Sequence, residues 1–173
     1  MPPSFLLRPW REGDRIALQR HANNRKVADN LRDVFPHPYT LADAEWFIRH
    51  ISIQEGHLSF AIDVAGEAVG SIGAVRLPDV YQASAEIGYW LGEAYWGQGI
   101  TTQALRQTVP LVFAHWPGVE RIFAGVFAHN SASIRVLEKM GFVPEGILRR
   151  AIVKNGVVSD VYQLAIWRDS YLN

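Results

Sequence analysis

The sequence predicts a single α/β domain in which a mixed sheet of about six or seven strands is flanked by about four helices. The chain of 173 residues has the length of one domain. Apolar patterns with the period of strands alternate along it with patterns that have the period of helices. No linker, repeat or low-complexity segment divides it. We therefore expect residues 1–173 to form one domain, with a core over about residues 5–168.

Seven segments carry the apolar pattern that is typical of strands. Turn residues separate them, and the Ala65-Gly66 and Asn155-Gly156 pairs each favour a tight hairpin turn. The predicted strands are residues 5–10, 58–64, 68–77, 83–91, 119–128, 142–149 and 157–166.

Four segments have the period of helices that bury one face. Asp14 is expected to cap the first helix, and Thr40 with Asp43 resembles a capping box ahead of the second. Pro110 lacks a main-chain N–H, so it should kink the third helix or end it early. The predicted helices are residues 14–24, 41–54, 100 onward and 131–140.

Composition argues against several classes of protein. The 17 basic and 17 acidic residues give a net charge of zero without a basic tract, so no nucleic-acid partner is expected. No apolar run approaches the ~20 residues of a membrane span, and the first residues do not resemble a signal peptide. This favours a cytoplasmic protein without a membrane partner. Because the chain has no cysteine, thiolate metal sites and a cysteine nucleophile are excluded, and we expect no metal.

The most informative segment is the turn that follows the strand at residues 83–91. Gly97 and Gly99 stand between this strand and the third helix. A glycine turn at a helix start presents main-chain N–H groups at the positive end of the helix dipole, which suits a phosphate or pyrophosphate. Taken alone, the pattern is equally typical of a sharp turn without a ligand. Other segments must therefore decide between the two interpretations.

Three segments together resemble the GCN5-related N-acetyltransferase (GNAT) superfamily, and within it the RimJ/RimL-type branch that acetylates ribosomal-protein N-termini. The chain departs from the superfamily's pyrophosphate signature at Trp96, where Gln or Arg is usual, and at Thr101, where Gly or Ala is usual. The matching segments are residues 36–40, residues 96–101, and Asn130-x-x-Ser133 followed by Gly141-Phe142.

The resemblance implies an N-acetyltransferase that moves the acetyl group of acetyl-CoA directly to a primary amine. It also implies that the strand before the glycine turn splays from its neighbour and leaves main-chain groups free for the thioester and the pantetheine arm. The residues expected to bind coenzyme A are Tyr89, Trp90, Leu91, Trp96, Gly97, Gln98, Gly99, Ile100, Thr101, Thr102, Asn130, Ser133 and Lys139.

Two residues are candidates for catalysis. Glu86 is a lone carboxylate in an apolar strand, which is unusual unless it faces a cavity. The resemblance supports its action as a general base through water; the alternative is a structural carboxylate on the solvent side. Many relatives carry a tyrosine as the acid for the departing thiolate where this chain has Leu137, so that role is vacant. Ser133 is a candidate to hydrogen-bond the sulfur, or it simply caps its helix.

The acceptor site is expected in the variable parts of the chain. Asp160 would recognise a cationic amine, although each of these residues also has an ordinary surface or core interpretation. The acceptor itself stays open between a protein N-terminus and a small amine. The residues expected to bind it are His37, Tyr39, Trp90, Asp160 and Tyr162.

Other functions remain to be weighed against this one. An acyl-CoA-binding sensor or regulatory module without efficient catalysis is the alternative. A kinase-like nucleotide binder is set aside, because the glycine turn lacks the Lys-Ser/Thr ending of a phosphate loop. Relatives often pair through their C-terminal strands, so both a homodimer through residues 157–166 and a monomer stay open.

Overall fold

A seven-stranded sheet runs through the computed structural model, which describes residues 3–172. Its strand order is β1-β2-β3-β4-β5-β7-β6, and all neighbours are antiparallel except β4 and β5, which are parallel. This confirms the predicted fold class. The strands are β1 (Leu6–Arg8), β2 (His57–Val64), β3 (Glu67–Arg76), β4 (Ser84–Leu91), β5 (Arg121–Phe127), β6 (Val143–Lys154) and β7 (Val157–Trp167).

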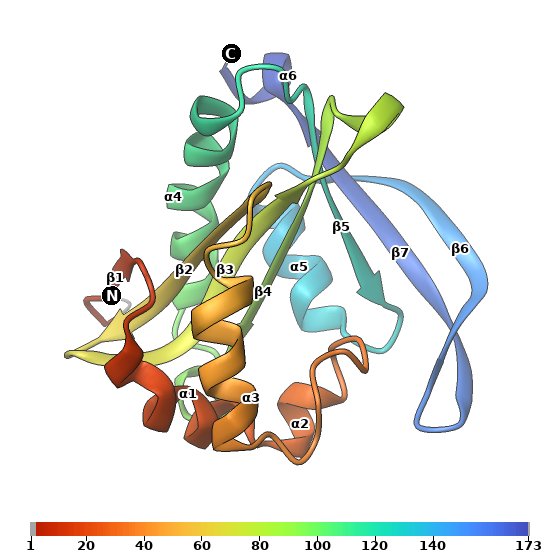
Figure 1. Cartoon of the computed structure of the whole chain (residues 1–173). Coiled ribbons are helices and arrows are strands. Elements are labelled where there is room, and N and C mark those ends of the chain that lie inside the picture. Colours follow the sequence, from red (N-terminus) through yellow and green to blue (C-terminus); the bar gives the residue numbers. More distant parts are fainter. Residues whose placement is uncertain (1–2, 173) are drawn as a thin grey trace.

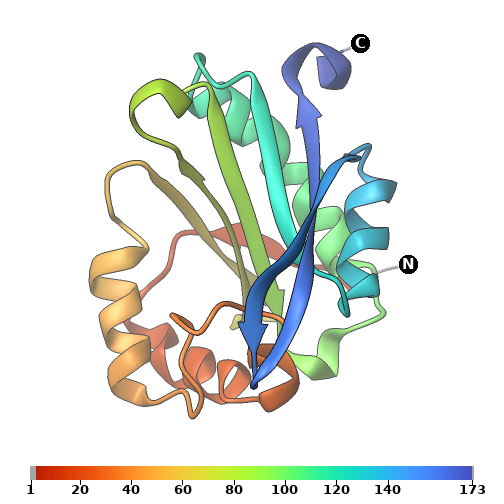
Figure 2. The same cartoon turned by 90° about the vertical axis from the view of Figure 1, so that its right-hand side faces the viewer.

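Helices cover both faces of the sheet. In Figure 1, α1 and α3 lie in front of the sheet and α4 and α5 behind it, and Figure 2 shows the same layers from the side. The four predicted helices are present, and α2 and α6 are two short additions. The α-helices of the described chain are α1 (Arg15–Ala22), α2 (Arg25–Ala28), α3 (Leu41–Trp46), α4 (Ile100–His115), α5 (Ser131–Lys139) and α6 (Arg168–Leu172).

The two faces bury cores of unequal size. The larger core joins the sheet to α4 and α5 through side chains such as Ile72, Leu105 and Leu137, each fully buried. The smaller core lies under α1 and α3 and contains Leu18 and Tyr39. Full burial of each large apolar side chain contributes about 1.5–3 kcal/mol, so α4 and α5 are the more firmly held layer.

Several predicted boundaries move. β1 is shorter than expected and ends at Arg8, whereas β6 runs on to Lys154. The helix expected to reach residue 54 ends in a π turn, Phe47–Ile51. The Thr40–Asp43 capping box is confirmed, because the Asp43 N–H donates to the Thr40 hydroxyl and the Thr40 N–H donates to the Asp43 carboxylate. This capping box was therefore predictable from the sequence, whereas the ends of β1 and β6 were not.

Asp14 does not cap α1 with its side chain, which corrects the prediction. Its carboxylate accepts hydrogen bonds from the Arg8 guanidinium at 2.7 and 2.8 Å, and Arg8 also binds Asp63 at 2.6 Å. All three charged side chains are buried. Burial opposes ionisation, yet the hydrogen bonds from Arg8 and Arg11 hold the pKa of Asp14 below its usual value. A buried arginine thus takes the carboxylate that a cap would use.

Pro110 does not end α4, which continues to His115, so the predicted early end is wrong. A proline inside a helix removes one hydrogen bond. The apolar face of α4 outweighs this loss, because Leu105, Val109 and Val112 are fully buried on either side of the proline. Among the described residues, no helix has the length and hydropathy that a membrane span requires.

Candidate active site

The parallel strands β4 and β5 separate just before the glycine turn (Figure 1). They pair only over residues 84–86 of β4 and 121–123 of β5. The Gly92 N–H donates to Val69 of β3 at 2.8 Å. Because main-chain direction alternates along a strand, the main-chain groups of Tyr89 and Leu91 point toward the gap beside β5. The Leu91 carbonyl accepts a hydrogen bond from the Trp96 indole at 2.6 Å, so the Tyr89 main chain and the Leu91 N–H are the groups left to meet a ligand there.

The glycine turn has the backbone conformation that its sequence favours. Gly97 and Gly99 adopt φ values of 72° and 77°, which side-chain-bearing residues rarely adopt, and α4 begins at Ile100. The Gln98 side chain turns back to the Ala94 carbonyl at 2.9 Å. A Cβ on Gly97 would meet nothing within 4 Å, so the turn is open on that side. The first N–H groups of α4 lack acceptors within the helix and are available to an anion.

The start of α5 lies next to the Tyr89 side chain. Asn130 caps α5 by accepting a hydrogen bond from the Ser133 N–H at 3.1 Å. The Ser133 hydroxyl lies 2.7 Å from the Tyr89 hydroxyl, and either can donate. Burial raises the pKa of Tyr89 to about 12, so its phenol is protonated at neutral pH. Lys139 is exposed at the opposite end of α5.

The contact of the Tyr89 phenol with Ser133 was not predicted from the sequence, since only the main chain of Tyr89 was expected to act. The alternation of side chains between the two faces of β4 was the sequence signal that could have revealed this contact. Ile87, Tyr89 and Leu91 share the face toward α4 and α5, whereas Glu86 and Trp90 share the other.

A cavity of about 310 Å³ lies on the α1–α3 face of the sheet. Its floor is made by paired positions of β2, β3 and β4, and Glu86 lies in one row with His57 and Val75. Gly88 lies one row further along β4, and a Cβ added there would meet nothing within 4 Å. The expectation that Glu86 faces a cavity is met: its side chain lines this one and is 27% exposed.

Aromatic side chains line the cavity, and one ion pair joins two of its lining residues. Phe35 contacts Trp90 and Tyr39 at ring-centre distances of 5.7 and 4.8 Å. The Arg32 guanidinium binds the Glu86 carboxylate at 2.8 Å, a contact that sequence reasoning missed. Burial lowers the pKa of His57, so this imidazole is neutral at pH 7.

The structure brings only part of the predicted acceptor site together. Tyr39 and Trp90 line the cavity with Glu86, whereas His37 is exposed and does not. Asp160 also lies elsewhere, and its carboxylate accepts hydrogen bonds from the Arg150 N–H at 2.8 Å and the Arg149 guanidinium at 3.0 Å. Tyr162 packs against the larger core. The last hairpin therefore contributes neither of its predicted residues to the cavity wall.

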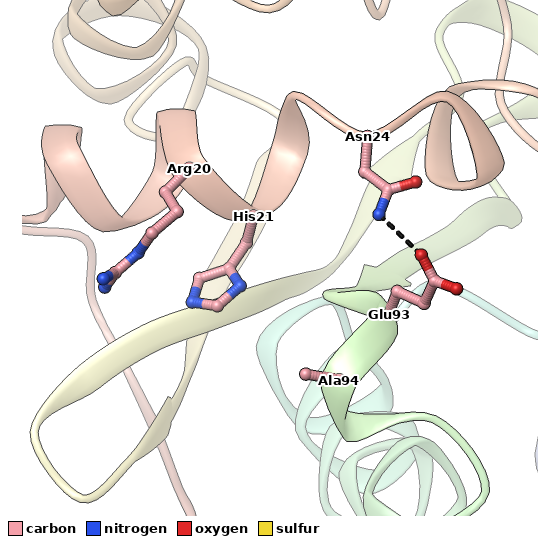
Figure 3. A pocket seen from close by; sticks show the side chains of 5 residues that line it. All are labelled: Arg20, His21, Asn24, Glu93 and Ala94. Carbon is pink, nitrogen blue, oxygen red and sulfur yellow. Dashed lines mark hydrogen bonds between the residues drawn. The ribbon is translucent and has the colours of Figure 1, made fainter.

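A second, polar hollow lies between the end of α1 and the turn at Glu93–Tyr95 (Figure 3). Figure 3 shows Asn24 and Glu93 pointing toward each other, and their side chains are 2.8 Å apart. Arg20 and His21 both bind Glu67. These polar groups already have protein partners: Arg20 and His21 join α1 to β3, and Asn24 joins the segment after α1 to the turn at Glu93–Tyr95. Within residues 3–172, no group of three or more His, Asp or Glu side chains is placed to hold a metal ion.

Comparison with known proteins points in one direction. The family model of the acetyltransferase (GNAT) domain matches residues 4–143. "Probable N-acetyltransferase YjcK" of Bacillus subtilis (strain 168) is 44% identical over 98 residues, which cover 55% of this chain and 54% of that protein. The spermidine N(1)-acetyltransferase of Escherichia coli (strain K12) is 25% identical over 175 residues, which cover 98% of this chain and 89% of that enzyme.

Among solved structures, Mycobacterium smegmatis RimJ in complex with CoA-disulfide has a TM-score of 0.82 and 26% identity, and the match covers 99% of this chain and 85% of that chain. Three Bacillus relatives named as N-acetyltransferases are matched over only 54, 65 and 52% of their length. This chain therefore spans between about half and two thirds of those relatives.

Proposed function

The chain belongs to the GNAT acetyltransferase family, and we propose that it transfers the acetyl group of acetyl-CoA directly to a primary amine. The observation that carries this proposal is the separation of β4 from β5 directly before the glycine turn. The gap opens beside Tyr89, whose side chain meets α5, and Glu86 on the same strand lines the cavity on the other face. One strand thus connects a cofactor side with an acceptor side.

The residues at the gap fit coenzyme A. The turn at Gly97 and Gly99 offers main-chain donors and an open approach for the pyrophosphate. Asn130 and the free edge of β4 offer polar groups for the pantetheine amides. When bound, acetyl-CoA supplies the acetyl group as a thioester. Thr101, Thr102 and Lys139 are the further contacts that we propose for the phosphates and the adenosine.

The chain's own residues would manage the protons. Glu86 would take the proton of the incoming amine through a water molecule, as a general base does. The amine nitrogen then forms the new bond to the acetyl carbon while the carbon–sulfur bond breaks. The main-chain N–H of Tyr89 or Leu91, beside the gap between β4 and β5, would stabilise the negative charge that develops on the carbonyl oxygen. The departing sulfur would receive a proton from the Tyr89–Ser133 hydroxyl pair, since Leu137 is fully buried and carries no acid.

A release assay for free thiol tests the proposal. Purified protein is mixed with acetyl-CoA and a panel of amines that contains amino acids, amino-acid amides, peptides with free N-termini and polyamines. We expect thiol release well above the acceptor-free background for at least one class, together with one equivalent of acetylated amine by mass spectrometry. Release that stays at background over the whole panel would contradict it.

An acyl-CoA-binding module without efficient catalysis is a second candidate. Two features favour it: the family resemblance implies a tyrosine where this chain has Leu137, and the Arg32 guanidinium pairs with the Glu86 carboxylate. Tight binding of acetyl-CoA by calorimetry, combined with background thiol release for every amine, would support this alternative.

A further inference from the structure

We propose that the acceptor is a free α-amino acid with an apolar side chain, whose carboxylate binds Arg32 while its amine meets Glu86. This inference rests on the proposed function, because it takes the cavity beside Glu86 as the acceptor site. It goes further in naming Arg32 as the residue that selects the acceptor.

The charges of the cavity argue for a zwitterion. Among the described residues that line it, Glu86 is the one carboxylate, Arg32 is the one guanidinium, and His57 is neutral at pH 7. Glu86 already pairs with Arg32 at 2.8 Å. An acceptor that is only cationic must break this pair and leave Arg32 beside a second positive charge. A zwitterion gives each member of the pair a new partner.

The position of Arg32 suits an exchange of partners. Its side chain is 70% exposed, so it can move without leaving a buried void. Its chain segment is held by the tip of the β6–β7 hairpin, where Lys154 binds Asp33 at 2.7 Å and Asn155 binds Asp29 at 2.9 Å. The backbone of Arg32 is therefore fixed, while its guanidinium remains free to turn from Glu86 to a carboxylate.

Size and polarity of the cavity favour a small apolar side chain. Its volume of about 310 Å³ lies at the lower end of the ~300–1,000 Å³ that is usual for ligand sites. Leu18, Phe35, Phe47 and Trp90 form apolar walls, and Gly88 leaves the floor open. In a peptide, the first carboxyl group is an uncharged amide, so Arg32 would have no anion to bind. These features favour a free amino acid over a protein N-terminus.

Leucine and leucinamide provide the test, because they share an amine and a side chain and differ in the carboxylate. We expect kcat/KM of the native protein to be about fivefold higher for leucine, because the exposure of Arg32 limits an ion pair with the carboxylate to about 1 kcal/mol. Arg32→Gln should reduce this ratio to about two or less through loss of leucine turnover. Arg49→Gln is the matched control, because it removes an exposed arginine that pairs with Glu12 outside the cavity. In this variant the ratio of kcat/KM for leucine to that for leucinamide should equal the ratio of the native protein.

A binding measurement separates this inference from the proposed function. Calorimetry with leucine and unacetylated coenzyme A involves no turnover, and we expect the affinity for leucine to fall about fivefold in Arg32→Gln. Equal kcat/KM for leucine and leucinamide, or a preference for a leucyl peptide or for spermidine, would overturn the inference while the acetyltransferase proposal stands. Leucine binding that depends on Arg32 without thiol release for any amine would instead overturn the proposed function alone.

Discussion

The two sides of β4 are built in different ways. On the proposed cofactor side, the glycine turn supplies main-chain groups from a short stretch of sequence, with Gly97 and Gly99 at positive φ and the first turn of α4 directly behind them. On the acceptor side, the cavity consists of side chains that come from distant segments, and the Arg32–Glu86 pair joins residues 54 positions apart. The glycine turn is therefore formed by residues that are close in the sequence, whereas the cavity depends on the tertiary structure.

Because the two sides differ in this way, substitutions on each side should affect different properties of the protein. A main-chain donor is present whatever the side chain, so we propose that the turn binds phosphate although Trp96 and Thr101 depart from the family signature. A cavity wall changes with every substitution at Arg32, Tyr39 or Trp90. We therefore expect variants of the turn to alter affinity for coenzyme A, and variants of the cavity to alter turnover and acceptor choice.

Glu86→Gln should have the largest effect. The change keeps the shape of the side chain and removes its basic oxygen, so we expect kcat to fall by about 10²–10⁴. Affinity for acetyl-CoA by calorimetry should not change, because Glu86 lies on the acceptor side of β4. Glu145→Gln is a close control: that carboxylate is 28% exposed and pairs with Arg121 on the same sheet. A loss of coenzyme A affinity in Glu86→Gln would show that Glu86 also contributes to cofactor binding, which contradicts its assignment to the acceptor side.

Gly99→Val should have the next largest effect. The left-handed backbone at Gly99 costs a branched residue ~1–2 kcal/mol, and its side chain would also cover the N–H groups of the turn. We expect affinity for acetyl-CoA to fall about 100-fold, measured by calorimetry. Gly118→Val is the control, since a Cβ there meets nothing within 4 Å and its φ is not positive.

If Gly99→Val does not fold, as judged by circular dichroism, Gly99→Ala keeps the prediction testable with an expected loss of about tenfold. Unchanged affinity in a folded Gly99 variant would refute the placement of the pyrophosphate at this turn.

How much the sequence could predict follows the same division. The order of strands and helices along the chain and the position of the glycine turn depend on local patterns, and the structure has them where the sequence indicates. The Arg32–Glu86 pair depends on where a loop after α2 meets β4, and nothing in the spacing of the two residues carries that information.

Two of the predicted acceptor residues lie outside the cavity for the same reason. Asp160 was expected to meet a cationic amine because it is a carboxylate on a strand, and a neighbouring Arg149 takes it instead. His37 lies next to Tyr39 in the chain, yet Tyr39 is buried while His37 is exposed. His37 and Tyr39 were both predicted because they are close in the chain, whereas the packing of separate elements buries only Tyr39.

Tyr89→Phe should have a smaller effect. It removes one of the two hydroxyls that contact each other beside α5 and leaves Ser133 in place. We expect kcat to fall about tenfold, below the 10²–10⁴ that is typical when a sole proton donor is lost. Since burial raises the pKa of Tyr89 to about 12, its phenol remains a donor at alkaline pH. Turnover of the native protein should therefore not decline through Tyr89 ionisation near pH 10, where an ordinary tyrosine ionises.

Tyr162→Phe controls for the loss of a hydroxyl from a half-buried tyrosine on β7. Tyr89→Phe with the kcat of the native protein across this pH range would assign the proton to another group.

The smallest effect should come from the ion pair that holds the Arg32 segment from outside the cavity. Lys154 is buried at the hairpin tip and binds Asp33, which is 81% exposed. Because an exposed partner limits such a pair to about 1 kcal/mol or less, we expect Lys154→Met or Asp33→Asn to raise the acceptor KM about two- to fivefold without changing coenzyme A affinity. The double variant should be no worse than either single one, since the two residues act as a unit. Additive effects, or a change confined to coenzyme A, would show that the hairpin does not position Arg32, and the acceptor side would then owe its geometry to α2 alone.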